Sequence, residues 1–363
     1  MARQLDPLVR STGALDSFRA MPIELTVDVT EAVGLGEPLH TKVTAVLPEP
    51  GTLADPPVVC FGFPGGGYSR GYFTFDMPGA AGGGEAGWHA ARGWVFVACD
   101  HLCVGESDAP DDPTNVTFEH LAAANNATVT EVLRLLAAGA VADGIPPLSD
   151  ATVLGIGQSM GGCLTIVQQG QHHTYDGVGI LGFSAIHTVL WMPPSAPEPE
   201  VAFVPRGADV VVIGPTEAVE LTPQFALDDS GLPGVTPGFH YDDVPRAIVE
   251  ADMVEWPARG GRVPPWASAT VPPCAITMMS PGVVAPEAAV INVPVFVGVG
   301  ERDVVPDPRA EPRAYQHSPD VTVSICPRMA HMHNMASTRE RLWQRLHSWG
   351  TGVAANGTSR SSF

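Results

Sequence analysis

The chain has 363 residues with 45% hydrophobic and 16% charged side chains, which excludes intrinsic disorder and leaves room for one large α/β unit or about two domains. Its 19 Lys and Arg against 39 Asp and Glu give a net charge of −20, which argues against nucleic-acid and anionic-lipid partners because both need basic surfaces. We therefore expect a globular protein whose partner is a small molecule, and a homodimer is compatible with these features.

The N-terminal residues 1–7 lack the apolar run that follows the basic residue of a signal peptide. No stretch of the chain reaches the roughly 18 uninterrupted apolar residues of a membrane span. Six cysteines are too few for a disulfide scaffold of this length, and no Cys-x-x-Cys pair suggests a zinc or redox site. From these features we expect a cytoplasmic protein without a membrane span.

Two segments near the N-terminus, residues 23–30 and 41–48, alternate apolar and polar side chains, which predicts a β-ribbon. Farther along, short runs that are apolar on both faces alternate with helical stretches. Such runs suit buried parallel strands that are covered by helices on each side. Apolar residues recur at helical spacing over 118–138 and 337–349, which predicts two long helices. The apolar runs fall at residues 57–63, 94–99, 152–156, 177–181, 293–299 and 321–325.

The alternation is lost between residues 188 and 286, where proline is frequent and Trp and Met are scattered. We interpret this segment as a cap or lid insertion over one end of the sheet; a structured excursion without a role in binding is the alternative. The chain then divides into a first core part over 1–187, the insertion over 188–286, a second core part over 287–350 and a flexible tail over 351–363.

A Gly-x-Ser-x-Gly sequence, residues 157–161, follows the apolar run 152–156 and precedes a helical stretch. In a nucleophile elbow of this kind the serine, here Ser159, has strained backbone angles and its Oγ is lifted clear of the sheet, while the glycines let neighbouring backbone pack closely. The helix that follows points its N-terminal amides toward developing negative charge. This setting predicts Ser159 as a catalytic nucleophile.

With this motif in its strand–turn–helix setting, the chain resembles an α/β-hydrolase of the serine esterase or lipase type over residues 23–350. The resemblance implies a mostly parallel central sheet with helices on both faces and a cap insertion. It also implies a catalytic triad in the chain order nucleophile, acid, histidine, with each residue after its own strand.

The turn at residues 300–306 follows the apolar run 293–299 and resembles the acid turn of this family. The resemblance assigns Asp303 to the catalytic position. Glu301 and Asp307 are the rival carboxylates. A turn or helix-capping role for Asp303 is the alternative without catalysis, because such carboxylates are common in loops.

Two histidines follow the last predicted strand, in the sequence Arg-Met-Ala-His-Met-His-Asn of residues 328–334. The resemblance implies His331 as the catalytic base, at the entry to the final helix, with His333 as the second candidate. A His-x-His sequence can also bind a metal, but no third ligand cluster with useful spacing accompanies it. We therefore expect no metal and no cofactor.

A glycine-rich loop at residues 63–71 follows the first buried run. It resembles the His-Gly-Gly-Gly oxyanion loop of lipases and esterases, with Pro64 in place of the histidine. The resemblance implies the backbone amides of Gly66 and Gly67 as oxyanion-hole donors, with the amide of Met160 after the nucleophile as their partner. A plain glycine-rich turn is the alternative; a phosphate loop is disfavoured because no Gly-Lys-Ser/Thr follows.

A serine nucleophile implies acyl transfer through a tetrahedral oxyanion and an acyl-enzyme. We expect a carboxylesterase that hydrolyses esters with small to medium apolar or aromatic groups, because the insertion carries Trp and Met side chains. A carbon–carbon hydrolase, a lactonase or an acyltransferase could use the same triad. A ligand-binding protein without catalysis, built on the same fold, is the remaining alternative.

Overall fold

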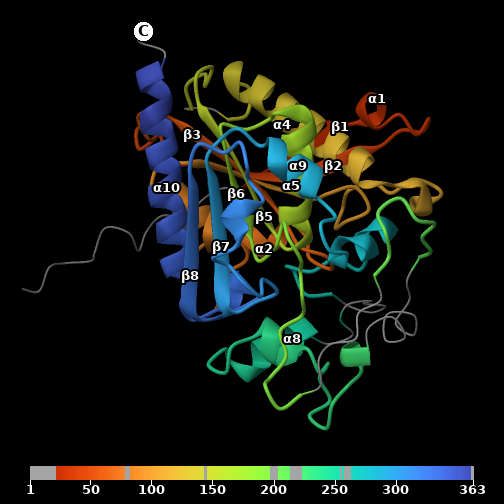
Figure 1. Ribbon diagram of the computed structural model, residues 1–363. Coiled ribbons are helices and arrows are strands. Elements are labelled where there is room, and N and C mark those ends of the chain that lie inside the picture. The colour runs from red at the N-terminus through yellow and green to blue at the C-terminus, as the bar shows by residue number, and fades with distance from the viewer. Residues whose placement is uncertain are drawn as a thin grey trace, which may run out of the picture.

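A twisted sheet of eight strands, in the order β1-β2-β4-β3-β5-β6-β7-β8, forms the centre of the protein in the computed structural model (Figure 1). The structure describes residues 22–77, 82–142, 145–196, 203–212, 223–253, 256 and 263–360. The strands are β1 (Pro22–Asp28), β2 (His40–Val46), β3 (Val58–Phe63), β4 (Val95–Cys99), β5 (Thr152–Gln158), β6 (Gly177–Leu181), β7 (Val295–Arg302) and β8 (Val321–Ala330).

The predicted β-ribbon and all six predicted parallel strands are present. Burial is wrong for the last of them: residues 321–324 of β8 are half-buried and Ile325 is exposed, because β8 is the edge strand of the sheet. β1 pairs antiparallel with β2, and β2 pairs antiparallel with β4. All remaining pairs, from β4 through β3 to β8, are parallel. The carboxyl ends of β3 and β5 to β8 therefore meet at one edge of the sheet, which is where ligands bind in open parallel sheets.

Successive residues of a central strand enter two different cores, one on each face of the sheet. In β3, Val59 and Phe61 pack on the face covered by α4 (Phe118–Ala137) and α5 (Met160–His172). Val58 and Cys60 pack on the opposite face, which is covered by α3 (Gly84–Ala90) and α10 (Arg339–Arg360). This two-sided burial explains why the strand sequences are continuously apolar. The helices are α1 (Thr30–Val33), α2 (Gly71–Thr74), α3 (Gly84–Ala90), α4 (Phe118–Ala137), α5 (Met160–His172), α7 (Thr236–Phe239), α8 (Arg246–Met253), α9 (Ala285–Val290) and α10 (Arg339–Arg360).

The predicted helix over 118–138 corresponds to α4, but the prediction of a tail over 351–363 is wrong for residues 351–360. The last helix, α10, continues to Arg360, and residues 361–363 lie outside the described residues. Packing accompanies the extension: Ala354 is buried, and a Cβ on Gly350 would lie only 2.6 Å from the side chains of Leu154 and Trp94. The low helix propensity of this glycine-containing segment is thus overcome by contacts that the sequence does not reveal.

The segment between β6 and β7 adds no strand to the sheet in its described residues. Figure 1 shows α8 and the loops beside it gathered beyond one end of the sheet, below β7 and β8 in this view. Two backbone hydrogen bonds join α7 to the residues after β8, from His331 N–H to the Gly238 carbonyl at 3.0 Å and from Met332 N–H to the Phe239 carbonyl at 2.9 Å. This segment therefore contacts the edge at which the parallel strands end.

Two features of the described part of the chain bear on the sequence predictions about membrane spans and cysteines. None of its helices combines the length and the apolar character needed to cross a membrane. All six cysteines are buried and free. Short 3₁₀ helices complete the described elements, at Pro113–Asn115 (η1), Pro223–Phe225 (η2), Pro273–Met279 (η3), Glu311–Arg313 (η4) and His333–Met335 (η5).

Candidate active site

Ser159 lies in a sharp turn between β5 and α5 and has the strained backbone angles φ 54° and ψ −117°. Its N–H donates to the Leu181 carbonyl at 2.7 Å, which fixes the turn to the end of β6. Both flanking glycines are required by close backbone packing: a Cβ on Gly157 would meet the Gly161 carbonyl, and a Cβ on Gly161 would meet the Phe63 carbonyl. The turn therefore has the geometry expected of a nucleophile elbow.

Asp303 lies in the turn after β7 and is buried. The Gly300 N–H donates to its Oδ2 at 2.7 Å, and the Val304 N–H donates to its Oδ1 at 2.8 Å. Burial alone would raise the pKa of the Asp303 carboxyl, but His333 and the hydrogen bonds of both nearby histidines hold it well below its usual range. Asp303 is therefore ionised at neutral pH.

Both candidate histidines bind this one carboxylate, each on a different oxygen. His331 Nδ1 lies 2.7 Å from Asp303 Oδ1, and His333 Nε2 lies 2.7 Å from Asp303 Oδ2. An ionised carboxylate only accepts hydrogen bonds, so each of these ring nitrogens carries a proton. The Nε2 of His331 is then the nitrogen that can accept a proton, as a general base requires.

Gln158, the residue before Ser159, connects the elbow to His331. Its side-chain Nε2 donates to the His331 carbonyl at 3.0 Å and lies 3.4 Å from His331 Nε2. Among the described residues, Ser159 Oγ forms no hydrogen bond with His331. Hydrogen bonds between catalytic groups are often long before substrate binds. Here Gln158, which precedes Ser159 in the chain, contacts His331 with its side chain.

The predicted oxyanion loop lies directly against the elbow. A Cβ on Gly65 would collide with the Gln158 side chain and lie 3.1 Å from the Cβ of Ser159. A Cβ on Gly66 would lie 4.0 Å from the Met160 sulfur, and Gly67 has a left-handed φ of 79°, which favours glycine. Met160 begins α5, so its N–H has no acceptor within the helix. Of the three predicted donor residues, Met160 thus follows Ser159 directly and Gly66 lies near the Met160 side chain, while Gly67 is the next residue of the loop.

Polar side chains behind the oxyanion loop hold it in place. Burial lowers the pKa of His101 to about 4, so its ring is neutral, and its Nε2–H donates to the Pro64 carbonyl at 3.2 Å. The Arg70 N–H donates to Asp100 Oδ1 at 2.6 Å. These contacts fix the loop from the side of β4.

A buried carboxylate of the insertion, Asp252 in α8, also binds this loop, and sequence analysis missed it. It accepts hydrogen bonds from Tyr68 Oη at 2.8 Å, from Trp266 Nε1 at 2.7 Å and from His240 Nε2 at 2.9 Å. Tyr68 follows Gly67 in the oxyanion loop, so Asp252 joins the insertion to that loop. A single aspartate in a short helix has no sequence pattern that points to this contact.

The rival carboxylates lie away from both histidines. Glu301 is exposed and accepts the Arg328 N–H at 2.8 Å, and Asp307 is exposed and accepts the Arg309 N–H at 3.2 Å. Of the three predicted acids, Asp303 is the one that contacts histidine. Within the described residues, no group of three His, Cys, Asp or Glu side chains could hold a metal ion.

Comparison with known proteins identifies the fold. Neither protein-family models nor curated protein sequences match this chain. Among solved structures, a proline iminopeptidase from Mycobacterium smegmatis has a TM-score of 0.57 at 16% identity, covering 92% of this chain and 99% of its own. A thermophilic esterase from Thermogutta terrifontis has a TM-score of 0.55 at 15% identity, with coverage of 92% and 100%. A soluble variant of monoglyceride lipase from Saccharomyces cerevisiae has a TM-score of 0.56 at 13% identity, with coverage of 87% and 92%.

These matches and the mostly parallel eight-stranded sheet define an α/β-hydrolase fold. The fold class expected from the sequence is therefore confirmed. At these identities the likeness shows the fold alone, and the reaction has to be argued from the site.

Proposed function

We propose that this protein is a serine hydrolase that cleaves carboxylic esters, with Ser159 as nucleophile, His331 as general base and Asp303 as the orienting acid. The observation that carries the proposal is the strained Ser159 turn beside a buried histidine–aspartate pair joined at 2.7 Å. These groups follow β5, β8 and β7, whose carboxyl ends meet at one edge of the sheet. Helix-capping, the alternative role for Asp303, does not account for its bonds to two histidines.

In the proposed mechanism, His331 Nε2 takes the proton of Ser159 Oγ as the oxygen attacks the ester carbonyl. The carbonyl oxygen becomes an oxyanion that accepts hydrogen bonds from the amides of Gly66, Gly67 and Met160. The resulting imidazolium, stabilised by the Asp303 carboxylate, gives its proton to the departing alcohol. Water then attacks the acyl-enzyme carbonyl while His331 takes its proton. The second tetrahedral intermediate collapses, the bond between the acyl carbon and Ser159 Oγ breaks, and His331 gives the proton to Oγ as the acid is released.

We further propose that the substrate has a small to medium apolar or aromatic group and that residues 188–286 act as a cap over it. Apolar side chains of this segment support this. The Phe239 ring packs edge-on against the His331 ring, with 5.0 Å between the ring centres, and the Trp256 ring packs against Phe239 with 4.6 Å between the ring centres. Val271 lies beside Gly66. The net charge of −20 disfavours multiply charged anionic substrates.

Hydrolysis of p-nitrophenyl esters of increasing acyl length tests the proposal. We expect turnover by the wild-type chain, a burst of p-nitrophenol equal to the enzyme concentration where deacylation is slow, and a fall of at least about 10⁴-fold in kcat for Ser159→Ala. The matched control Ser149→Ala changes an exposed serine and should leave kcat unchanged. Wild-type activity that persists in Ser159→Ala would overturn the proposal. Product analysis with added alcohol separates hydrolysis from acyl transfer.

A further inference from the structure

His333 is a buried histidine that the proposed mechanism does not use, although it binds the same carboxylate as the general base. Asp303 accepts four hydrogen bonds, of which two come from backbone amides and two from imidazoles. A catalytic triad needs only one histidine on its acid. The second imidazole, 1% exposed and with its ring centre 6.4 Å from that of His331, therefore needs a separate explanation.

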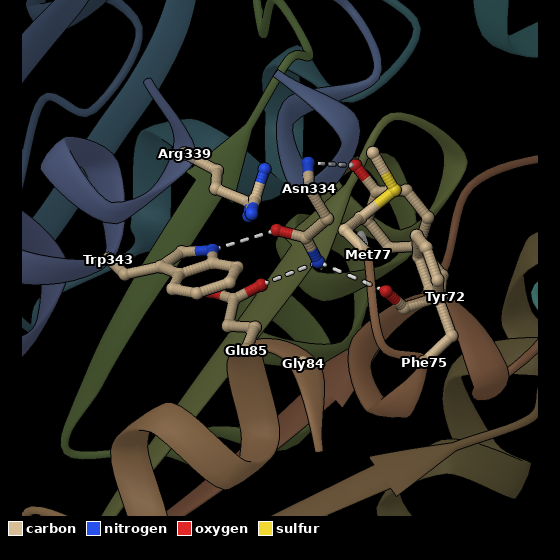
Figure 2. Close-up of a pocket in the computed structure, with 8 residues that line it drawn as sticks. All are labelled: Tyr72, Phe75, Met77, Gly84, Glu85, Asn334, Arg339 and Trp343. Atoms are coloured by element: carbon tan, nitrogen blue, oxygen red, sulfur yellow. Dashed lines mark hydrogen bonds between the residues drawn. The ribbon is translucent and has the colours of Figure 1, made fainter. Parts of the chain in front are cut away.

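The surroundings of His333 are polar, buried and rich in ionisable groups. Its neighbour Asn334 donates from Nδ2 to Glu85 Oε2 at 2.8 Å and to the Tyr72 carbonyl at 3.1 Å, and its N–H donates to Tyr72 Oη at 3.0 Å (Figure 2). Burial raises the pKa of Glu85 to about 7, against the opposing effects of Asn334 and His333. Asp303 after β7 binds His333, His331 after β8 shares that carboxylate, and Glu85 in α3 interacts with His333 electrostatically. Farther out, Tyr72 in α2 contacts the neighbouring Asn334, Arg339 in α10 lines the same small pocket as Asn334, and the Asp252–His240 pair of the insertion lies beyond Tyr72.

We propose, building on the proposed function, that His333 is a positioning residue that fixes the second oxygen of Asp303 and weakens the hold of this carboxylate on the proton of His331. An ionised carboxylate favours the imidazolium form of a histidine beside it. A second donor on the same carboxylate takes up part of its charge, which leaves less of that charge to stabilise the imidazolium of His331. With His333 in place, the carboxylate therefore attracts a proton to His331 less strongly.

The test is the pH dependence of kcat/KM for an ester substrate in His333→Ala, His333→Gln and wild type. His333→Ala should move the midpoint of the acidic limb upward by about one pH unit and lower the plateau kcat about tenfold, because the carboxylate loses one of its four donors. Glutamine places its Nε2 the same number of bonds from the backbone as histidine does. His333→Gln should therefore return the midpoint most of the way to the wild-type value.

A matched control is His347→Gln in α10, where the histidine contacts His89 and stacks on Trp94. This change should leave both the midpoint and kcat unaltered. An unchanged or lowered midpoint in His333→Ala, or an equal shift in His347→Gln, would overturn the proposal. If His333→Ala does not fold, His333→Asn, whose shorter amide does not reach Asp303, takes its place.

A ¹H NMR titration, which needs no turnover of substrate, tests the role of His333 separately from the proposed function. In Ser159→Ala, the proton shared by His331 and Asp303 should give a downfield ¹H NMR resonance whose titration midpoint moves upward when His333→Ala is added. The same shift is expected whether or not the protein hydrolyses esters. Failure of ester hydrolysis with this shift present contradicts only the proposed function, whereas a midpoint that does not move contradicts the role of His333.

Discussion

Gly182, which follows β6, lies against the histidine–aspartate pair, and its replacement by alanine is a direct structural probe of that pair. A Cβ at this position would lie 3.0 Å from His331 Nδ1 and 3.2 Å from Asp303 Oδ1, so it would press against the side of the hydrogen bond that joins these two atoms. Both partners are buried, and Asp303 is held by four hydrogen bonds. They can make room only by shifting away from the added Cβ by a few tenths of an ångström, which disturbs the geometry of their hydrogen bond.

The magnitude of the effect follows from two separate terms. Gly182 has a φ of 56°, and an alanine in this left-handed region costs about 1–2 kcal/mol in folding free energy. A misplacement of about 1 Å in a catalytic group can cost about 10²-fold in rate, so a shift of a few tenths of an ångström should lower kcat about tenfold. We expect Gly182→Ala to show both losses.

Gly34→Ala is the matched control, because Gly34 has a φ of 71° and no atom lies within 4 Å of an added Cβ. It should lose the same 1–2 kcal/mol or so of stability and retain full activity. Urea denaturation measures the first quantity and p-nitrophenyl ester hydrolysis the second. Equal kcat values for Gly182→Ala and Gly34→Ala would refute the assignment of His331 and Asp303 to the reaction.

Three further predictions concern neighbouring groups. Glu85 has a pKa raised to about 7 by burial, so its contribution to stability is present below about pH 4.5 and is lost as pH rises through about 7. In urea denaturation, the free energy of unfolding of Glu85→Gln should therefore rise by up to about 3 kcal/mol relative to that of wild type between pH 5 and 8. Parallel pH profiles of the two unfolding free energies would contradict this. Tyr68→Phe removes a hydrogen bond to Asp252, so it should lower the free energy of unfolding by about 1 kcal/mol and lower kcat severalfold. If both values are unchanged, this contact does not support the oxyanion loop. Asp303→Asn should lower kcat about 10⁴-fold in steady-state assays, and a loss under tenfold would exclude Asp303 as the orienting acid.

The parts of the fold that could be predicted from sequence are those in which local pattern and tertiary role coincide. Strands such as β3 are apolar on both faces because helices cover both, and Ser159 was predictable because its turn requires glycines at fixed positions. The order of acid and histidine came from the resemblance, and the contact between Asp303 and His331 agrees with it.

Other features depend on contacts between distant segments, which leave no local pattern. The extension of α10 depends on the packing of Ala354 and Gly350. The sequence offered His331 and His333 as alternatives, whereas the fold brings both to Asp303. A tight turn at Met332, closed by the hydrogen bond from the His333 N–H to the His331 carbonyl at 3.0 Å, separates the two histidines. The bond between Asp252 and Tyr68 joins residues 184 positions apart, so no spacing rule could predict it.

Covalent labelling with a fluorophosphonate tests the central claim most directly, because this probe reacts with a serine hydroxyl only where a base and an oxyanion hole activate it. The native chain is incubated with the probe, digested, and mapped by mass spectrometry, with heat-denatured protein and His331→Ala treated in parallel. We predict one adduct, on Ser159, that forms rapidly in the native protein, slowly in His331→Ala and not at all after denaturation. A native, folded chain that carries no adduct at Ser159 would contradict the assignment of this protein as a serine hydrolase.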